Sequence, residues 1–108
     1  MSVQELTAAN FDVMVESNEL LVIDFWAEWC GPCKAFSKIM TDVAKEYQDV
    51  VFASVNIENE KALAEEFAVR SIPFVMIIKK RAVVYADSGL LSAVSLRELL
   101  DQAKALKA

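Results

Sequence analysis

Histidine is absent from this 108-residue sequence, and glycine, proline and cysteine occur only twice each. Without histidine, the chain lacks the side chain that most often serves as a general base near neutral pH and most often binds metal ions. Two cysteines are too few for the disulfide framework that holds a small secreted domain together. Any chemistry at these cysteines therefore needs another group to move the proton.

Basic residues are also scarce, since 16 acidic residues outnumber 11 basic ones and leave a formal net charge of −5. This balance argues against a protein that binds nucleic acid or an anionic membrane surface. The longest basic run is Lys79-Lys80-Arg81, which is either the solvated tip of a hairpin or a partner-docking patch. The apolar run LLVIDFW, residues 20–26, is far too short to span a membrane and contains Asp24.

Apolar residues are abundant, at 56% of the chain, and at this length they can form a core without cross-links. We find no linker, internal repeat or low-complexity stretch, and we predict a single domain over residues 1–108. The first residues, MSVQELTAAN, lack the basic start and apolar stretch of a targeting signal. We therefore expect a cytoplasmic protein.

The hydrophobic pattern predicts alternating strands and helices. Strands are expected over residues 3–6, 20–26, 50–57, 74–78 and 82–86, and helices over residues 7–16 (capped by Thr7), 30–47 and 59–67. A last helix begins either at the capping box Ser95-Leu96-Arg97-Glu98 or at the competing Ser92. The order β-α-β-α-β-α-β-β-α predicts an α/β fold with a central mixed sheet of about five strands flanked by four helices.

Both cysteines lie in Cys30-Gly31-Pro32-Cys33, where the strand over residues 20–26 meets the next helix. A zinc ion or an iron–sulfur cluster needs about four ligands, which two thiolates without histidine cannot supply. Inert core cysteines fit poorly with Gly-Pro between them, and a static disulfide across so small a loop would add little stability. We favour the remaining interpretation, which is a redox-active dithiol.

The position of the cysteines at a helix start supports this interpretation. A cysteine there meets unpaired backbone N–H groups and the positive end of the helix dipole, and both lower the pKa of its thiol. Cys33 lies one turn further along the same face, so we expect two sulfurs within bonding reach, with Cys30 exposed and Cys33 sheltered. Pro32 falls in the first turn, where its missing N–H costs nothing.

The segment VIDFWAEWCGPCK, residues 22–34, resembles the active-site segment of the thioredoxin family. Three further segments, VNIE, RSIPF and SGLLS, are similar to the family's third strand, its cis-proline loop and its late glycine turn, and they occur in the same order. The resemblance extends over nearly the whole chain and implies the thioredoxin fold. It also implies a general protein disulfide reductase that acts by dithiol–disulfide exchange.

The resemblance implies a role for each residue around the cysteines. Cys30 would attack a disulfide of a target protein, and Cys33 would resolve the mixed disulfide. Asp24 matches the family's buried carboxylate and would serve as the base for Cys33, unless it is only a solvated strand end. Trp26 and Lys34 would support the site from either side of the motif.

A docking surface for target proteins is also implied. Ile72-Pro73 resembles the family's cis-proline pair, whose backbone pairs with the substrate of relatives like an added strand, although an ordinary trans turn is the alternative. For Trp29 the alternative is a position in the core. The expected surface is flat and weakly polar, and consists of Trp29, Gly31, Pro32, Ile72, Pro73 and Gly89.

Several positions depart from the family pattern. Ser54 stands where members usually carry a lysine near the buried aspartate, and Lys80-Arg81 stands where the hairpin turn usually contains glycine. Lys38 replaces a helix-kinking proline, and Phe74 replaces the threonine after the cis-proline. These departures leave the cysteine motif intact and fall in regions expected to tune acid–base chemistry and partner choice.

The resemblance implies that the protein itself binds no cofactor and no metal. Its redox-active disulfide would receive electrons from NADPH through a flavin-dependent thioredoxin reductase. The expected partners are this reductase and disulfide-containing target proteins, with no nucleic acid and no membrane, and we expect a monomer. Two other functions stay open: an oxidase or isomerase of the same fold, and a redox-assisted binding subunit of a partner complex.

Overall fold

The computed structural model describes residues 3–107, so the predicted domain of residues 1–108 extends past it at both ends. The elements are β1 (Gln4–Glu5), α1 (Phe11–Ser17), β2 (Leu20–Trp26), α2 (Gly31–Ala44), β3 (Val51–Asn56), α3 (Lys61–Glu66), β4 (Phe74–Lys79), β5 (Ala82–Ser88) and α4 (Ala93–Ala105). This order confirms the prediction of an α/β fold with a mixed five-stranded sheet and four helices.

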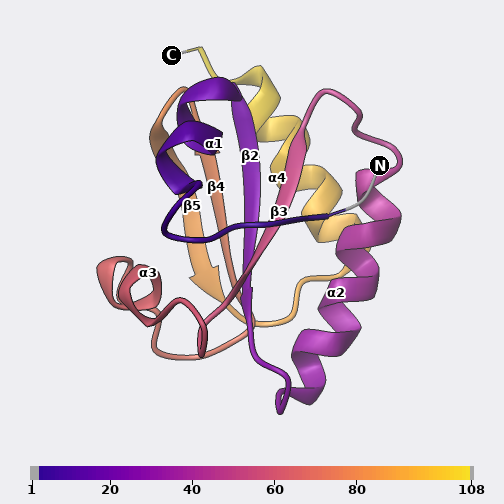
Figure 1. Ribbon diagram of the computed structural model, residues 1–108. Helices are drawn as coiled ribbons and strands as arrows, with labels where there is room; N and C mark the ends of the chain where they lie inside the picture. The colour runs from indigo at the N-terminus through magenta and orange to yellow at the C-terminus, as the bar shows by residue number, and fades with distance from the viewer. Residues whose placement is uncertain (1–2, 108) are drawn as a thin grey trace.

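Strand β2 lies in the middle of the sheet, whose order is β1-β3-β2-β4-β5 (Figure 1). It runs parallel to β3 and antiparallel to β4, so both of its edges are hydrogen-bonded. A strand with neighbours on both sides and helices on both faces is buried, here from Leu20 to Phe25, which explains its near-continuous apolar run. The loop that follows β2, which carries the cysteines, therefore starts from a rigid central strand.

Helices cover both faces of the sheet, with α2 and α4 on one face and α1 and α3 on the other (Figure 1). Successive side chains of a strand point to opposite faces. Leu20 and Val22 of β2 accordingly join the core beneath α2 and α4, while Leu21 and Ile23 join the core beneath α1 and α3. The same alternation places Asp24 on the face that α2 covers.

Two helices near the N-terminus are shorter than predicted. Helix α1 begins at Phe11, because Thr7 and Asn10 first close a turn in which each side chain accepts from the other's backbone N–H, at 2.8 and 3.3 Å. Thr7 therefore caps this turn and not the helix. Helix α2 ends at Ala44, because the backbone beyond it continues only in tight turns.

The structure decides which of the two predicted sites starts α4. Ser92 is the N-cap, and its Oγ accepts from the backbone N–H of Ser95 at 3.0 Å. The capping box at Ser95 is wrong, since that residue already lies inside the helix. The competing start at Ser92 is confirmed.

The basic run is not uniformly solvated. Lys80 and Arg81 are exposed at the β4–β5 turn, but Lys79 is only 3% exposed. Its ammonium donates to three carbonyl oxygens at the end of α4, those of Ala103, Lys104 and Leu106. The last carbonyls of a helix have no partner within it, so a cation at this end satisfies them and opposes the helix dipole. Lys79 therefore caps α4 from a neighbouring strand.

Candidate active site

The cysteine motif forms the junction between β2 and α2. Cys30 is the N-cap of α2 in an extended conformation, and its Sγ accepts from the backbone N–H of Cys33 at 3.1 Å. Pro32 occupies the first turn, where no N–H is needed. Cys30 and Cys33 are joined in a disulfide with their Cα atoms 5.2 Å apart. The sulfur of Cys30 thus already receives the kind of hydrogen bond that stabilises a thiolate.

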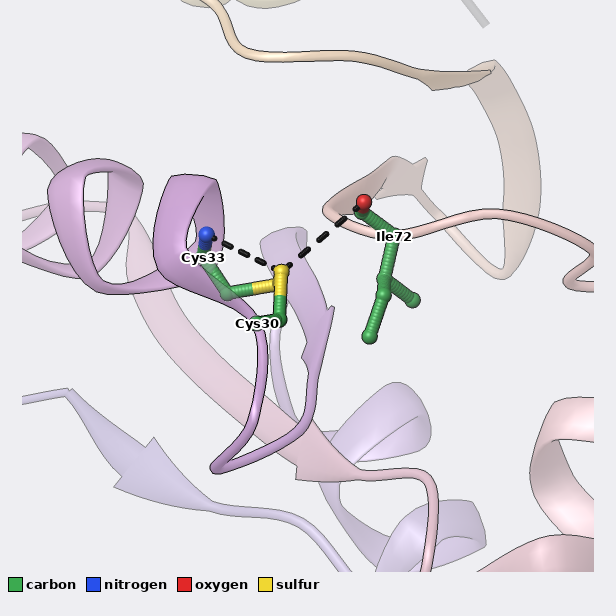
Figure 2. The surroundings of a disulfide bond; sticks show 3 residues. All are labelled: Cys30, Cys33 and Ile72. Atoms are coloured by element: carbon green, nitrogen blue, oxygen red, sulfur yellow. Dashed lines mark hydrogen bonds between the residues drawn. A yellow bond between two sulfur atoms is a disulfide. The ribbon is translucent and has the colours of Figure 1, made fainter.

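The two sulfurs differ less in exposure than the sequence suggests. Cys30 is 5% exposed and Cys33 is 1% exposed, so the expectation of a freely exposed Cys30 is wrong in degree, although the order is as expected. Figure 2 shows one reason: the backbone oxygen of Ile72 lies 3.9 Å from Cys30 Sγ and covers it from the side. This neighbour is 42 residues away along the chain.

The loop that brings Ile72 to the disulfide is fastened from another segment. The Ile72–Pro73 peptide bond is cis, and the backbone N–H of Gly89 donates to the carbonyl oxygen of Pro73 at 2.8 Å. Gly89 has a φ of +120°, a conformation that a residue with a side chain rarely adopts. Gly89, one of the two glycines of the chain, is therefore required where its own turn meets the Ile72–Pro73 loop.

Asp24 is a buried and incompletely paired carboxyl group. It lies within β2, opposite Ser54 of β3 and Val75 of β4, and it is 2% exposed. Its Oδ1 has no hydrogen-bond partner among the described residues. Burial disfavours the charged form and raises the pKa of Asp24 from 3.8 to about 7. The alternative of a solvated strand end is therefore wrong.

A cavity of about 350 Å³ lies beside this carboxyl group. Ser54 borders it, and its small side chain leaves space where a longer one would fill it. The cavity is lined by Val3, Asp24, Trp26, Cys33, Lys34, Ser37, Met40 and Ser54. It therefore brings the predicted base, the predicted resolving cysteine and both predicted supporting residues to one space.

Trp29 is exposed, at 67%, so the alternative of a core position is wrong. Its indole Nε1 donates to Glu58 Oε2 at 2.7 Å, which holds the ring beside the cysteine loop. Sequence reasoning missed Glu58 as a site residue. The available signal was its place just after β3, because the carboxyl ends of the parallel strands β2 and β3 meet at one edge of the sheet.

The predicted docking surface is only partly exposed. Gly31, Pro32 and Gly89 are exposed as Trp29 is, whereas Ile72 is half-buried and Pro73 is buried. Ile72 nevertheless lies against the disulfide through its backbone. Trp26 and Lys34 lie apart from this surface, at the cavity beside Asp24.

Other kinds of site were sought within residues 3–107. No three cysteine, aspartate or glutamate side chains of that range gather in a group that could hold a metal ion. None of the helices in the same range is both long enough and apolar enough to cross a membrane.

Comparison with known sequences gives a consistent set of relatives. A family model described as Thioredoxin matches residues 2–102. A putative thioredoxin 2 of Streptomyces coelicolor is 43% identical over 105 residues, which cover 97% of this chain and 78% of that protein. A thioredoxin of Buchnera aphidicola subsp. Acyrthosiphon pisum is 36% identical over 100 residues, which cover 91% of this chain and 93% of the relative.

Comparison with solved structures points the same way. Thioredoxin f from spinach chloroplast superimposes with a TM-score of 0.88 at 31% identity, over 96% of this chain and 95% of the other. The oxidised thioredoxin of Plasmodium falciparum gives a TM-score of 0.85 at 30% identity, over 96% of this chain and the whole of the other. The relatives found by sequence and those found by structure are therefore the same kind of protein, and each match covers almost the full length of this chain.

Proposed function

The chain belongs to the thioredoxin family and is a thiol–disulfide oxidoreductase, and from this premise we propose that it is a general protein disulfide reductase. The observation that supports this exchange chemistry best is the hydrogen bond from the Cys33 N–H to Cys30 Sγ at the start of α2. A donor and a helix dipole at this sulfur stabilise its thiolate, which is the form that attacks a target disulfide. The reducing direction is proposed from the similarity to thioredoxins.

The proposed reaction begins with the Cys30 thiolate. It attacks one sulfur of a target disulfide, a mixed disulfide forms, and the other target sulfur leaves as a thiolate that takes up a proton. Cys33 then gives its proton to the Asp24 carboxylate and attacks Cys30 Sγ. The Cys30–Cys33 disulfide forms and the second target thiolate is released, so that the target gains two electrons and this chain loses two.

The proton acceptor in this proposal follows from the arrangement of the site. Cys33 and Asp24 line the same cavity, so a water molecule there can connect the two groups. A carboxyl group with a pKa of about 7 is matched to proton transfer near neutral pH. Asp24 therefore takes the role that histidine, absent from this chain, has in many other enzymes.

Target proteins dock, in this proposal, over the exposed Trp29, Gly31, Pro32 and Gly89 and reach the Ile72 backbone next to Cys30. The protein works as a single domain, a monomer, in the cytoplasm. It holds no cofactor, and a flavin-dependent thioredoxin reductase recharges its disulfide with electrons from NADPH.

Insulin reduction tests the proposed activity. With dithiothreitol as the electron source, the native chain should reduce the insulin disulfides catalytically, and Cys30→Ser should abolish the reaction. Slow or absent reduction by the native chain would favour a binding subunit instead. A measured reduction potential as high as that of a strong oxidant would favour an oxidase or isomerase.

The roles of the two cysteines are tested by trapping and alkylation. Cys33→Ser should accumulate mixed disulfides with target proteins, whereas Cys30→Ser should accumulate few. In the reduced native chain, iodoacetamide should modify Cys30 before Cys33, because Cys30 is the less buried and is the N-cap. Peptide mapping that found Cys33 modified first would reverse the assignment.

A further inference from the structure

Strand β5 leaves one edge of the sheet unpaired. It is the last strand in the order β1-β3-β2-β4-β5, and Figure 1 shows it on the outer side of β4. Because β4 pairs with only one of its edges, the backbone groups on its other edge face away from the sheet. The strand at the opposite edge, β1, consists only of Gln4 and Glu5. Within residues 3–107, β5 therefore offers the one extended strand edge to which another strand can be added.

The side chains along this edge are apolar although they are exposed. The five residues AVVYA, 82–86, carry no charge, and all of them except Tyr85 are exposed. The exposed fractions of Val83 and Val84 are 49% and 38%. Edge strands are commonly kept from pairing by charged residues or prolines along their length, and these five residues include neither.

A groove on the α4 side of the sheet continues the apolar edge. It measures about 260 Å³ and is lined by Ile77, Val84, Tyr85, Leu99, Gln102, Ala103 and Leu106. Val84 and Tyr85 both line it although they are neighbours in the chain, because the register between β4 and β5 shifts there and forms a β-bulge. The exposed Val84 and Leu106 border the groove, so an apolar side chain from another molecule can enter it.

The two ends of β5 carry opposite charges. Arg81 stands directly before the strand, and Asp87 is its last residue but one. Both are exposed, and neither forms an ion pair with another residue of the range 3–107. The segment RAVVYAD, residues 81–87, is therefore complementary in charge to a second copy of itself that runs in the opposite direction.

We propose that two copies of this chain pair through their β5 edges, antiparallel and about a two-fold axis at Val84. Each apolar residue then faces an apolar residue of the second copy and each charge faces its opposite: Val84 with Val84, Val83 with Tyr85, Ala82 with Ala86, and Arg81 with Asp87. The next register, with Tyr85 on the axis, would instead place Asp87 opposite Val83 and leave the charges unpaired.

This pairing closes on itself. The two-fold axis uses the β5 edges of both copies, and the short polar β1 at the other edge offers no comparable strand, so association stops at the dimer. Gly89 follows β5, so the two docking surfaces lie at opposite ends of the pair. A single pair of strands is a small interface, and small interfaces are weak. The dimer therefore forms at high protein concentration, and the single chain remains the working unit of the proposed reaction.

Sedimentation velocity of the native chain between about 10 µM and about 1 mM is the direct test. The apparent mass should rise toward twice the chain mass of 12.0 kDa. In amide NMR spectra, the shifts that change with concentration should lie mainly along β5.

Exchanging the charges tests the register. Asp87→Arg alone and Arg81→Asp alone each place like charges opposite one another, twice per dimer because of the two-fold axis. Each should weaken the dimer by about tenfold or more. The double variant Arg81→Asp/Asp87→Arg restores opposite charges and should return the dissociation constant to within about threefold of the native value.

Two control variants carry the same changes of charge at exposed positions of α1 and α2. Asp12→Arg matches Asp87→Arg, and Lys38→Asp matches Arg81→Asp. Both controls should dimerise as the native chain does, because their positions lie outside the proposed interface. All of these substitutions are at exposed positions, and urea melts at low protein concentration verify that each variant folds.

Three results overturn the inference. A native chain that keeps a mass of 12.0 kDa at the highest concentration does not pair with itself. A dimer that Asp87→Arg leaves unchanged, or that the double variant does not restore, uses another surface or register. A mass that rises beyond that of a dimer contradicts the closed two-fold pair. None of these results bears on the insulin assay, which tests the proposed function separately.

Discussion

Asp24 lowers the stability of the fold through its burial, and it serves as the proton acceptor in the proposed reaction. The group is buried on the sheet face beneath α2, and the residue opposite it on β3 is the uncharged Ser54, so that its desolvation is not offset from that strand. Folding therefore raises the pKa of Asp24 to about 7. A residue that is unfavourable for stability and suited to proton transfer is typical of functional sites.

Removing the charge of Asp24 should stabilise the protein in a pH-dependent way. Between pH 3.8 and about pH 7, Asp24 is protonated in the folded state but ionised in the unfolded chain. The contribution of Asp24 to the free energy of unfolding is therefore greatest below pH 3.8 and is lost as the pH rises through about 7. Asp24→Asn should be more stable than the native chain by about 1–3 kcal/mol at pH 8 and show little advantage at pH 4. Urea melts at the two pH values measure this difference.

The same variant should resolve mixed disulfides more slowly, because Cys33 loses its proton acceptor. Asp42→Asn, on the exposed side of α2, is the matched control and should change neither stability nor turnover appreciably. An Asp24→Asn protein that is less stable at pH 8 and fully active would contradict both parts of the argument.

Helix α4 depends on a residue outside it. Lys79 ends β4 and donates to three carbonyl oxygens at the end of α4. Lys79→Met keeps most of the aliphatic length but removes the donors. It should lower the free energy of unfolding by about 1–3 kcal/mol and should increase hydrogen exchange in the last turn of α4 first.

The control for this change is Lys38→Met, on the exposed side of α2, which should alter stability by less than about 0.5 kcal/mol. If both methionine variants unfold at the same urea concentration, the three hydrogen bonds of Lys79 contribute nothing net to the fold.

The turn between β4 and β5 is strained by its sequence. Lys80 and Arg81 have φ values of +49° and +70°, in the left-handed region that glycine adopts most easily. Arg81→Gly should stabilise the protein by about 0.5–1 kcal/mol, because two-residue turns of this kind favour glycine at the second position. Thermal melts measure the gain, and Lys38→Gly within α2 should instead destabilise by about 1 kcal/mol.

Considered as a whole, the molecule brings three separate segments to one end of its sheet. These are the junction of β2 and α2, the loop at Ile72 and the turn at Gly89. The central position of β2 makes this possible, because a central strand ends in the middle of the sheet edge and not at its side.

The closeness of Trp26 to the cysteines predicts that tryptophan emission depends on the redox state of the disulfide. Trp26, at the end of β2, shares a cavity with Cys33, so the disulfide should quench its emission. In Trp29→Phe, where Trp26 is the only tryptophan, reduction should raise the emission. The same variant with Cys30→Ser cannot form the disulfide and should not respond to reductant. Unchanged emission in Trp29→Phe alone would place the disulfide too far from Trp26 for this arrangement.

Local sequence patterns were sufficient for the order of the elements and for the chemical centre. The apolar run of residues 20–26 has the same ends in the structure, and Cys30 and Cys33 lie at the helix start that their spacing indicates. These features depend on residues that are close together in the chain, where backbone periodicity and capping rules apply directly. Helix ends were less predictable, because Thr7 closes a turn ahead of α1 and Ser92 takes the N-cap position of α4 for which Ser95 competed.

Features that depend on distant segments could be seen only in the tertiary structure. The carbonyl oxygens that Lys79 caps are 24 to 27 residues away, Glu58 is 29 residues from Trp29, and the Ile72 oxygen that covers Cys30 is 42 residues from it. Nothing local in the sequence marks such pairs. The cavity beside Asp24 is of the same kind, since its size is set by the space that β3, α2 and the chain at Val3 leave between them. Burial and electrostatics are properties of that packing, and so the raised pKa of Asp24 was decided by the fold.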